Sequence, residues 1–411
     1  MRPGRVAEIS AWSLYDFANT VYSLNILSYH LPLWLTSDQK MPEWQFALVM
    51  GVVSCVAAFA MPFLGRLSDR LGVPGFLLVG VTVLSAGFTA LIAAADTLAL
   101  ALVFFCLSNI FYQCAQVLYN AQITRLGGKS ELGFVSGIGV SAGYMGSLVS
   151  LFLTRPFFRH GGHAGTFLPT AVLFFVFALP CLVWSVLRDV GWLRASAPSK
   201  LPAGLFAYDW RRVGALLGRT RDLARFSVFS LMILIVSSVL IMLMTVFSRN
   251  AAGLSESEIE TMIILSSLAG IAGALSSGWW YDREWSVRVV RGVGWCWIAV
   301  FVANAFWRVK PCFFVAATLG GFSLGSTWTV TRVYLLSLVP SAELGEYYGV
   351  FGFLGRIASL LGPFAAFSVL RLFSESGRVK YDVLNVFLMT LAAVGLAALY
   401  RIRTEETPRE G

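Results

Sequence analysis

Long apolar runs recur along the whole chain, and they constrain its fold more than any other feature of the sequence. Each run of roughly 18 to 25 residues is long enough to cross a ~30 Å hydrocarbon core as an α-helix. The runs are continuous rather than alternating, which favours helices over the strands of a barrel. Only 13% of the residues are charged, well below the share of about 25% that is usual in soluble domains. The sequence therefore predicts an all-α polytopic membrane protein.

Twelve runs are expected to span the membrane, and the joints between them hold most of the Lys and Arg residues. The runs cover residues 13–36, 45–65, 74–95, 98–123, 133–154, 167–187, 225–248, 258–279, 289–307, 311–337, 347–372 and 381–400. With the N-terminus inside, 20 of the 31 Lys and Arg lie in cytoplasmic joints, nine lie in outer joints, and Arg332 and Arg356 lie inside runs. This positive-inside bias predicts that both termini are cytoplasmic. It also accounts for the formal net charge of +9, and no basic surface segment interleaved with aromatics indicates a nucleic-acid partner.

The first run differs from the others because polar residues lie near its start. In "WSLYDFANTVYS", Asp16 and Asn19 lie one helical turn apart, and in a regular helix Ser23, Leu27 and His30 continue the same face. A basic start followed by an apolar run is faintly similar to a signal peptide. Polar residues interrupt this run, however, and no clean small-residue cleavage site follows. We therefore expect a retained first span with a polar stripe.

Cysteine and histidine give no sign of a disulfide or a metal site. All six cysteines lie within or beside apolar runs, where they act as small hydrophobic residues. His160 and His163 form an isolated pair in an outer joint, an arrangement that is rarely a metal site. We expect no metal and no cofactor.

Two motifs recur at nearly the same separation along the chain. "GRLSDR" returns in the second half of the sequence as "GWWYDR", which pairs Asp69 with Asp282. "ELGFVSG" returns as "ELGEYYG", which pairs Gly133 with Gly345, and the two separations differ by a single position. Two motifs at nearly one offset predict two pseudo-symmetric six-helix halves in the same orientation, related by an axis along the membrane normal. Substrate sites in such proteins lie between the halves near mid-membrane.

The expected halves are residues 1–187 and 225–400, and residues 401–411 form a cytoplasmic tail. A basic cytoplasmic linker, residues 188–224, joins them. Its stretch "YDWRRVGALLGRTRDLARF" is interpreted as a basic amphipathic helix on the inner leaflet, where anionic lipid attracts Arg. A solvated basic linker is the alternative.

The two halves, the basic central loop and the G-x-x-x-D-R motif resemble the major facilitator superfamily. The resemblance is closer to its vacuole-effluxer-like branch, the family of the autophagy-related vacuolar amino-acid effluxer, and it covers nearly the whole chain. Three stretches carry it: "WSLYDFANTVYS", "LYNAQITRLGGKSELGFVSGIGVSAGYMGSL" and "TRVYLLSLVPSAELGEYYGVFGFLGRIASLLGP". Two places depart from the pattern. Val73 and Pro74 follow Gly72 where the superfamily carries basic residues, and "ITRLGG" stands where relatives tend to carry an acidic residue and a proline.

This resemblance implies a secondary transporter, and not an enzyme, that moves a small polar solute by alternating access. Amino acids are the substrate class that the relatives suggest, and protons are a candidate co-substrate. We expect a monomer in a bacterial inner membrane, with membrane lipids as its other partners. A non-transporting sensor or scaffold and a membrane-embedded enzyme are the alternatives. An enzyme needs a cluster of acids, bases or metal ligands at one depth, and the sequence shows no such cluster.

Residues at the cytoplasmic joints are candidates for gating. Gly65 allows a close helix approach, and the resemblance places Asp69 beside the start of span eleven, near Gly345–Tyr347. The repeat predicts a mirror contact between Asp282 and the start of span five near Gly133. A carboxylate at a helix N-terminus is worth ~0.3–1 kcal/mol, and more when it is partly buried. Together these contacts are expected to latch the two halves on the cytoplasmic side.

Charged neighbours are expected to complete this latch. Arg70 lies near acids such as Glu343, and Arg283 is its equivalent in the second half. Arg356 lies two to three turns from the cytoplasmic end of span eleven and is assigned to inner-gate structure. The alternative is that Arg66, Arg70 and Arg283 are ordinary positive-inside anchors.

A second polar stripe lies in span four. Asn109, Gln113, Gln116 and Asn120 are spaced 4, 3 and 4 residues apart, so they share one helical face. Because an unpaired amide that faces lipid is costly, they either hold helices together or line a cavity. The resemblance favours a cavity wall, since span four usually lines the cavity in this superfamily.

Span ten carries the equivalent face, with Gly321, Gly325, Trp328 and Arg332. An Arg inside a bilayer costs roughly 2.5–3.5 kcal/mol on insertion scales, so it usually faces water or pairs with an acid. Arg332 is a candidate for holding a substrate carboxylate or phosphate, and a salt bridge to Asp16 is the alternative. Asp16 is also the strongest candidate for proton coupling, since burial favours the protonated form of a carboxylate.

Overall fold

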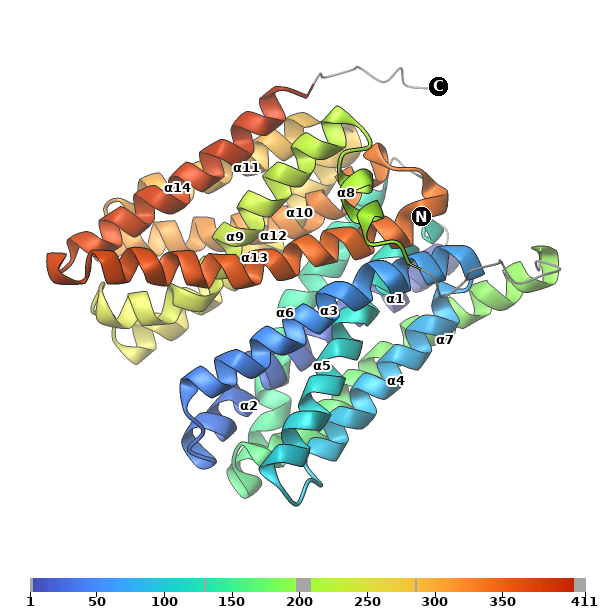
Figure 1. Ribbon diagram of the computed structural model, residues 1–411, viewed down its shortest axis with the longest axis horizontal. Helices are drawn as coiled ribbons and strands as arrows, with labels where there is room; N and C mark the ends of the chain where they lie inside the picture. Colours follow the sequence, from blue (N-terminus) through green and yellow to red (C-terminus); the bar gives the residue numbers. More distant parts are fainter. Residues whose placement is uncertain (1–2, 129–130, 197–207, 285–286, 403–411) are drawn as a thin grey trace. The chain divides into compact units, whose positions relative to one another are not determined.

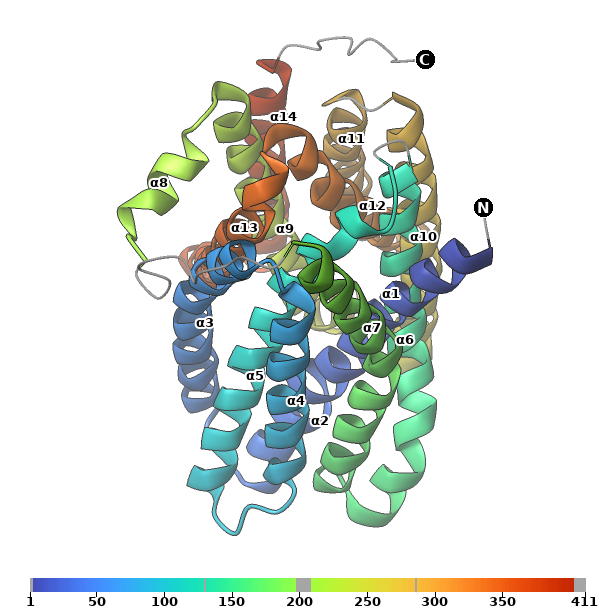
Figure 2. The same ribbon diagram turned by 90° about the vertical axis from the view of Figure 1, so that its right-hand side faces the viewer.

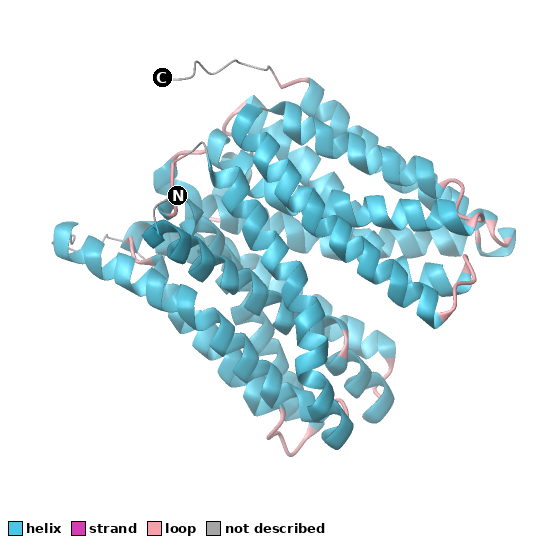
Figure 3. Cartoon of the chain, turned by 180° about the vertical axis from the view of Figure 1, so that it is seen from behind, coloured by secondary structure: helices cyan, strands magenta, loops and turns pink. Residues whose placement is uncertain are grey.

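The computed structural model describes residues 3–128, 131–196, 208–284 and 287–402. Helices joined by short turns make up this part of the chain, as the colours in Figure 3 show. Eleven helices within it are long and apolar enough to cross a membrane, and they match the second to the twelfth expected runs. The expected all-α polytopic class is therefore confirmed.

The helices follow the chain in two series separated by the expected linker. The first series is α1 (Pro3–Tyr22), η1 (Ser23–Ser28), α2 (His30–Leu33), η2 (Trp34–Asp38), α3 (Glu43–Leu71), α4 (Pro74–Ile92), α5 (Leu98–Ala121), η3 (Gln122–Arg125), α6 (Leu132–Gly161), η5 (Ala164–Thr166) and α7 (Phe167–Ser196). The second series is α9 (Arg221–Asn250), α10 (Glu256–Glu284), α11 (Val287–Asn304), α12 (Lys310–Leu338), η6 (Ser341–Glu343), α13 (Leu344–Leu372), η7 (Ser374–Ser376) and α14 (Val379–Tyr400). The short helix α8 (Arg211–Leu217) lies in the linker stretch expected to be amphipathic, and it buries Val213 and Leu216. Residues 197–207 of the linker and 403–411 of the tail lie outside the described residues.

The first expected run is not one regular helix. After Tyr22, α1 passes into the π-helical η1, and the backbone departs from helical geometry at Tyr29, with φ −131° and ψ −78°. Pro32 explains the break, because its ring excludes the carbonyl of Ser28 four residues earlier and it has no N–H to donate. A second π-helical segment, η2, follows the single turn of α2.

This break changes how the polar stripe of the first run is read. The 3.6-residue period that places residues on one face applies to α1 only, which ends at Tyr22. The assumption of one regular helix through Leu27 and His30 is therefore wrong, while Asp16 and Asn19 remain on regular α-helix.

Local sequence sets the ends of several long helices. Gly72 ends α3 with φ 68°, a left-handed conformation that costs little without a side chain, and its N–H donates to the Ser68 carbonyl at 2.9 Å. Pro74 then begins α4, because a residue in the first turn needs no N–H. The departure at Val73 and Pro74 from the superfamily pattern is thus a compact turn between two helices.

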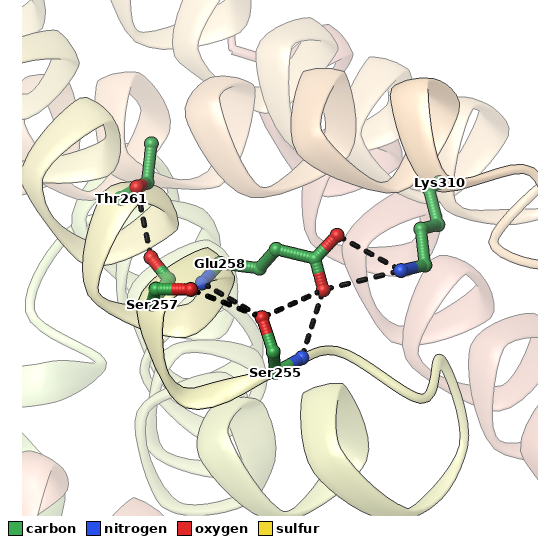
Figure 4. A network of polar contacts seen from close by, with 5 residues as sticks. All are labelled: Ser255, Ser257, Glu258, Thr261 and Lys310. Carbon is green, nitrogen blue, oxygen red and sulfur yellow. Dashed lines mark hydrogen bonds and ion pairs between the residues drawn. The ribbon is translucent and has the colours of Figure 1, made fainter.

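A capping box begins α10, and Figure 4 shows it from close by. The Glu258 carboxylate accepts from the Ser255 N–H at 2.8 Å, and the Ser255 hydroxyl accepts from the Glu258 N–H at 3.3 Å. Lys310, the first residue of α12, donates from Nζ to Glu258 Oε1 at 2.8 Å. Glu258 therefore caps the start of α10 and also binds the first residue of α12.

Contacts between residues divide the chain into two units. Unit 1 contains residues 1–127, 142–209 and 340–353, and unit 2 contains residues 128–141, 210–339 and 354–411. The first turns of α6 thus belong to unit 2, and the first turns of α13 belong to unit 1. The two exchanged segments, 128–141 and 340–353, are related by the same offset that pairs Gly133 with Gly345, so the exchange follows the sequence repeat.

Each unit is held together by a few extensive helix pairs. In unit 1, α4 packs against both α5 and α7 (Figures 1 and 2), and α1 packs against α7. In unit 2, α10 and α12 make the most extensive helix pair. Gly321 and Gly325 of α12 lie so close to the carbonyls of Ser266 and Gly270 on α10 that a side chain on either would overlap them. Small residues therefore set this helix separation.

Candidate functional site

Asp69, near the end of α3, binds the first turn of α13 within unit 1. Its two carboxylate oxygens accept hydrogen bonds from the N–H groups of Gly345 and Glu346, both at 2.8 Å. N–H groups in the first turn have no acceptor within their own helix, and the helix dipole favours negative charge beside them. One carboxylate therefore satisfies two donors that the helix itself leaves without an acceptor.

Asp282, near the end of α10, makes the repeat-related contact within unit 2. Its oxygens accept from the N–H groups of Gly133 and Phe134 in the first turn of α6, at 2.6 and 2.7 Å. The structure thus contains both of the acid-to-helix contacts expected for Asp69 and Asp282. Their role in gating stays a prediction.

Glycine makes both approaches possible. At these two contacts, a side chain on any of six glycines would overlap the backbone of the facing helix: Gly65, Gly345 and Gly349 in unit 1, and Gly278, Gly133 and Gly137 in unit 2. Gly65 faces Gly345, and Gly278 faces Gly133, so that a Cβ on one member of a pair would collide with the carbonyl of the other. The motif glycines therefore bring each carboxylate within hydrogen-bonding distance of its helix terminus.

Two of the basic residues beside these motifs lie over aromatic rings. The Arg283 guanidinium carbon is 3.9 Å from the ring centre of Trp279, one turn earlier on α10. The Arg66 guanidinium carbon is 5.6 Å from the ring centre of Tyr208. Because Trp279 is exposed, the contact of Arg283 fits the positive-inside anchor alternative.

The remaining gating candidates are distributed over both units. Arg70 lies in the last turn of α3 in unit 1, and Glu343 ends η6 just before α13 in the same unit. Arg356 is half-buried on α13, in the part of that helix that belongs to unit 2.

Asp16 and Asn19 are both buried on α1, with 8% and 3% of their surface exposed. Within the described part of the chain, neither the oxygen nor the nitrogen of the Asn19 side-chain amide has a hydrogen-bond partner, although both atoms are buried. A buried polar group without a partner costs about 1–3 kcal/mol, so such groups are uncommon and call for a physical reason. Ser23 differs, because it is half-buried and its hydroxyl donates to the Thr20 carbonyl at 3.3 Å.

The amide stripe of α5 is buried at one end and half-buried at the other. Asn109 and Gln113 are 1% and 6% exposed, and Gln113 Nε2 donates to Asn109 Oδ1 at 3.2 Å. Gln116 and Asn120 are half-buried, and no residue that the structure describes bonds to Asn120 Oδ1. Because the Asn109–Gln113 bond lies within one helix, it does not join α5 to a neighbour. This geometry favours a polar wall over interhelical bonding.

Stacked aromatic rings hold α1 against α5, and the sequence analysis missed them. Trp12 stacks on Tyr119 with ring centres 4.5 Å apart, and Tyr22 stacks on Tyr112 at 4.3 Å. The Tyr112 hydroxyl also donates to the backbone carbonyl of Asn19 at 3.2 Å. The signal was the seven-residue spacing of the two α5 tyrosines, which places them on one face. These contacts fix the backbone that carries Asp16 and Asn19.

The candidate residues on α12 differ in exposure and in the contacts they make. Trp328 is 43% exposed and Arg332 is half-buried. Gly321 and Gly325, on the face equivalent to the α5 stripe, serve the close packing against α10. Asp16 belongs to unit 1 and Arg332 to unit 2, and their pairing stays a prediction.

Asp189 is a further polar residue that the sequence analysis missed. It is fully buried on α7, where one oxygen accepts from the Phe76 N–H in the first turn of α4 at 3.0 Å. The other oxygen accepts from Arg125 Nη1 at 2.6 Å, and Arg125 Nη2 donates to the Gly72 carbonyl at 3.4 Å. Arg125 of the unusual "ITRLGG" stretch therefore neutralises a buried acid. The signal was an acid at the end of an apolar run.

Together, the repeated helices and the paired acid-to-helix contacts define a multi-pass membrane protein of the secondary-transporter class. The sequence matches the Major Facilitator Superfamily over residues 17–250 and again over residues 223–411, and the chain belongs to that superfamily. An uncharacterized protein of Aquifex aeolicus (strain VF5) is 27% identical over 366 residues, which is 88% of this chain and 89% of that protein. The uncharacterized MFS-type transporter YxiO of Bacillus subtilis (strain 168) is 23% identical over 409 residues, which is 92% of each chain.

Solved structures share the fold along nearly the whole chain. A bacterial homologue of the iron transporter ferroportin, in an outward-facing state, is 15% identical with a TM-score of 0.72, and the match covers 97% of this chain and 98% of that one. The human organic anion transporter MFSD10 is 16% identical with a TM-score of 0.69, over 97% and 99%. The fucose:proton symporter FucP of E. coli is 12% identical with a TM-score of 0.70, over 98% and 99%. At these identities the likeness shows the fold alone.

Proposed function

We propose that this protein moves a small polar solute across a membrane by alternating access, and that amino acids are its substrate class. The observation that carries the proposal is the buried Asn19 amide, which has no hydrogen-bond partner among the described residues and lies one turn from the buried carboxylate of Asp16. A polar solute that bonds to this amide offsets the cost of burying it. The name of the Bacillus subtilis relative as an MFS-type transporter supports transport, and the vacuole-effluxer-like resemblance supports amino acids.

The polar wall of unit 1 is the proposed solute-binding surface. It comprises Asp16, Asn19 and Ser23 of α1 with the amide stripe of α5. Amides bind carboxylates and ammonium groups alike, which suits a zwitterionic solute. In unit 2, Arg332 is proposed to hold a carboxylate through its two-pronged guanidinium, and Trp328 lies one turn from it on the same helix.

Gating is assigned to the two acid-to-helix contacts. Asp69 and Asp282 each hold the first turn of a helix that begins in one unit and continues in the other. Breaking such a contact exposes two N–H groups and removes a favourable charge, so the contacts act as cytoplasmic latches whose opening changes access. Gly65, Arg70, Arg283, Glu343 and Arg356 belong to the same proposed gate.

The membrane setting follows from the charge distribution. The excess of Lys and Arg in the joints on the side of the N-terminus supports two cytoplasmic termini. The two bacterial relatives support a bacterial inner membrane, and we propose a monomer because one chain contains both repeated halves.

Counterflow in liposomes tests the proposal. Protein in vesicles loaded with one unlabelled amino acid should accumulate the same labelled amino acid, and a panel of amino acids and other small solutes identifies the class. Exchange of none of these solutes by the folded protein would contradict the transporter proposal. Exchange confined to solutes other than amino acids would contradict only the substrate class.

Asp16→Asn tests proton coupling in the same vesicles. We expect the variant to lose uptake driven by a pH gradient while its thermal unfolding in detergent stays unchanged. Asp96→Asn is the matched control, because Asp96 is exposed in the joint between α4 and α5. A variant that keeps the full response to the pH gradient would remove Asp16 from this role.

A further inference from the structure

Unit 2 contains a pocket that the proposed transport surface does not use. It is lined by residues of α9, α11, α12 and α14, the helices labelled in Figure 1, and its lining includes Leu243, Phe313, Ala317 and Leu388. The space between atoms is about 640 Å³, including its open mouth. Most lining residues of α9 are half-buried, as are Asn304, Ala317 and Tyr381, whereas the remaining lining residues are buried.

The sequence repeat shows how the lining of this pocket differs from the equivalent positions in the other half of the chain. The offset of the "ELG" repeat also pairs the first residue of α5 with the first residue of α12, and it pairs Phe105 with Ala317 and Phe104 with Ala316. The same offset pairs Ala101 with Phe313 and Leu102 with Phe314, so the phenylalanine pair of unit 2 lies about one helical turn earlier than that of unit 1. Phe105 is fully buried in unit 1, whereas Ala317, at the equivalent position of α12, is half-buried and lines the pocket.

Three residues in the pocket lining carry polar groups, Asn304, Tyr381 and Asn385. Asn304 Nδ2 donates to Asn385 Oδ1 at 2.8 Å, and Asn385 Nδ2 donates to the Phe301 carbonyl at 3.0 Å. These bonds leave Asn304 Oδ1 as an acceptor with no donor from the described part of the chain. The Tyr381 hydroxyl likewise makes no hydrogen bond with a described residue. A few polar groups in an otherwise apolar lining are the usual composition of a small-molecule site.

We propose that this pocket binds an amphipathic molecule with an aliphatic body and one hydroxyl head group, such as a medium-chain alcohol. The body contacts the apolar lining, where Met244 adapts to a flexible chain. The head donates to Asn304 Oδ1 and accepts from the Tyr381 hydroxyl. This site is separate from the proposed solute surface, and its occupation does not require transport.

Photolabelling of the full chain in lipid nanodiscs tests the site. A diazirine derivative of octanol should label peptides of α9, α12 and α14 saturably, and unlabelled octanol should compete. Ala317→Phe places an aromatic ring in the pocket and should abolish saturable labelling. Val302→Phe is the matched control, because Val302 is an exposed residue of α11 outside the pocket lining and should leave labelling unchanged.

Two further variants keep the test decisive. Leu243→Trp enlarges a lining residue of α9 at a half-buried position that tolerates a larger side chain, and it should also abolish saturable labelling. Asn304→Leu should weaken labelling by the octanol probe while labelling by the matching octane probe persists. Non-saturable labelling, or equal labelling of wild type and of both folded pocket-filling variants, would overturn the proposal.

Mass spectrometry of the intact protein distinguishes the sources of the ligand. A lipid-derived chain that copurifies with wild type and is absent from Ala317→Phe assigns the pocket to a membrane component. Saturable octanol binding without a copurified chain assigns it to a free amphipathic solute. Octanol binding by a protein that exchanges no solute would leave this site standing while removing the transport proposal.

Discussion

Replacing Asp69 by Asn tests whether the acid-to-helix contact determines the stability of the first turn of α13. The substitution keeps the size and shape of the side chain and removes the charge. Its single carbonyl oxygen can accept from one of the two N–H groups of Gly345 and Glu346. Its NH₂ group then faces the other N–H, so that two donors oppose each other.

The size of the effect follows from these contacts. A hydrogen bond to a charged group contributes about 1.5–3 kcal/mol, and a charge at a partly buried helix terminus contributes up to ~2 kcal/mol. Asn retains one weaker neutral bond. The free energy of opening the first turn should therefore fall by about 2–4 kcal/mol, which increases its open population roughly 30-fold or more.

Hydrogen exchange measures this opening at the two amides themselves. The N–H groups of Gly345 and Glu346 have no acceptor within α13, so their protection depends on Asp69. In Asp69→Asn both should exchange faster, while the amides of Gly133 and Phe134, held by Asp282, should keep their rates. Unchanged exchange at Gly345 and Glu346 would refute the reasoning.

Two further predictions concern stability, measured by thermal or denaturant unfolding in detergent. Gly65→Ala should cost about 1–3 kcal/mol because its Cβ collides with the backbone of α13, whereas Gly87→Ala, which faces open space on α4, should be neutral or slightly stabilising. Arg125→Met leaves the buried Asp189 without its cation and should cost about 3–5 kcal/mol. Arg188→Met removes a surface ion pair with Glu8 and a long contact with the Trp184 ring, 6.0 Å from its centre, and should change stability by less than ~1 kcal/mol. Equal losses of stability in Gly65→Ala and Gly87→Ala would contradict the packing argument. Equal losses in Arg125→Met and Arg188→Met would contradict the burial argument.

The acid-to-helix contacts could be predicted because two motifs recur at nearly one offset. A single "GRLSDR" is consistent with a simple basic anchor. Its repeat, combined with the repeat of "ELG", indicated that Asp282 meets the helix that begins near Gly133 once Asp69 is placed near Gly345. Backbone N–H groups at a helix start are available whatever the side chain, so this prediction needed only the position of each helix start.

Other features depend on contacts that no local pattern encodes. Pro32 indicates that the first run is broken, but η1 and η2 are π-helical, which depends on packing around them. His30, just after the break, lies 3.1 Å from His163 between their Nδ1 atoms, a contact across 133 residues. The stacking of α1 on α5 and the burial of Asp189 likewise depend on which helices are neighbours. Sequence periodicity gives the face of a helix but not its partner.

The equivalent joints of the two halves show what a sequence repeat predicts and what it does not. In unit 1, the acid Asp189 of α7 binds the first turn of α4, where the helix dipole favours negative charge. In unit 2, Arg291 of α11 instead donates to the carbonyls of Leu399 and Ile402 at the end of α14, at 3.1 and 2.7 Å. A cation at a helix C-terminus and an anion at an N-terminus satisfy the same electrostatic requirement with opposite charges. The repeat therefore predicts which helices meet, while the residues at each joint decide its chemistry.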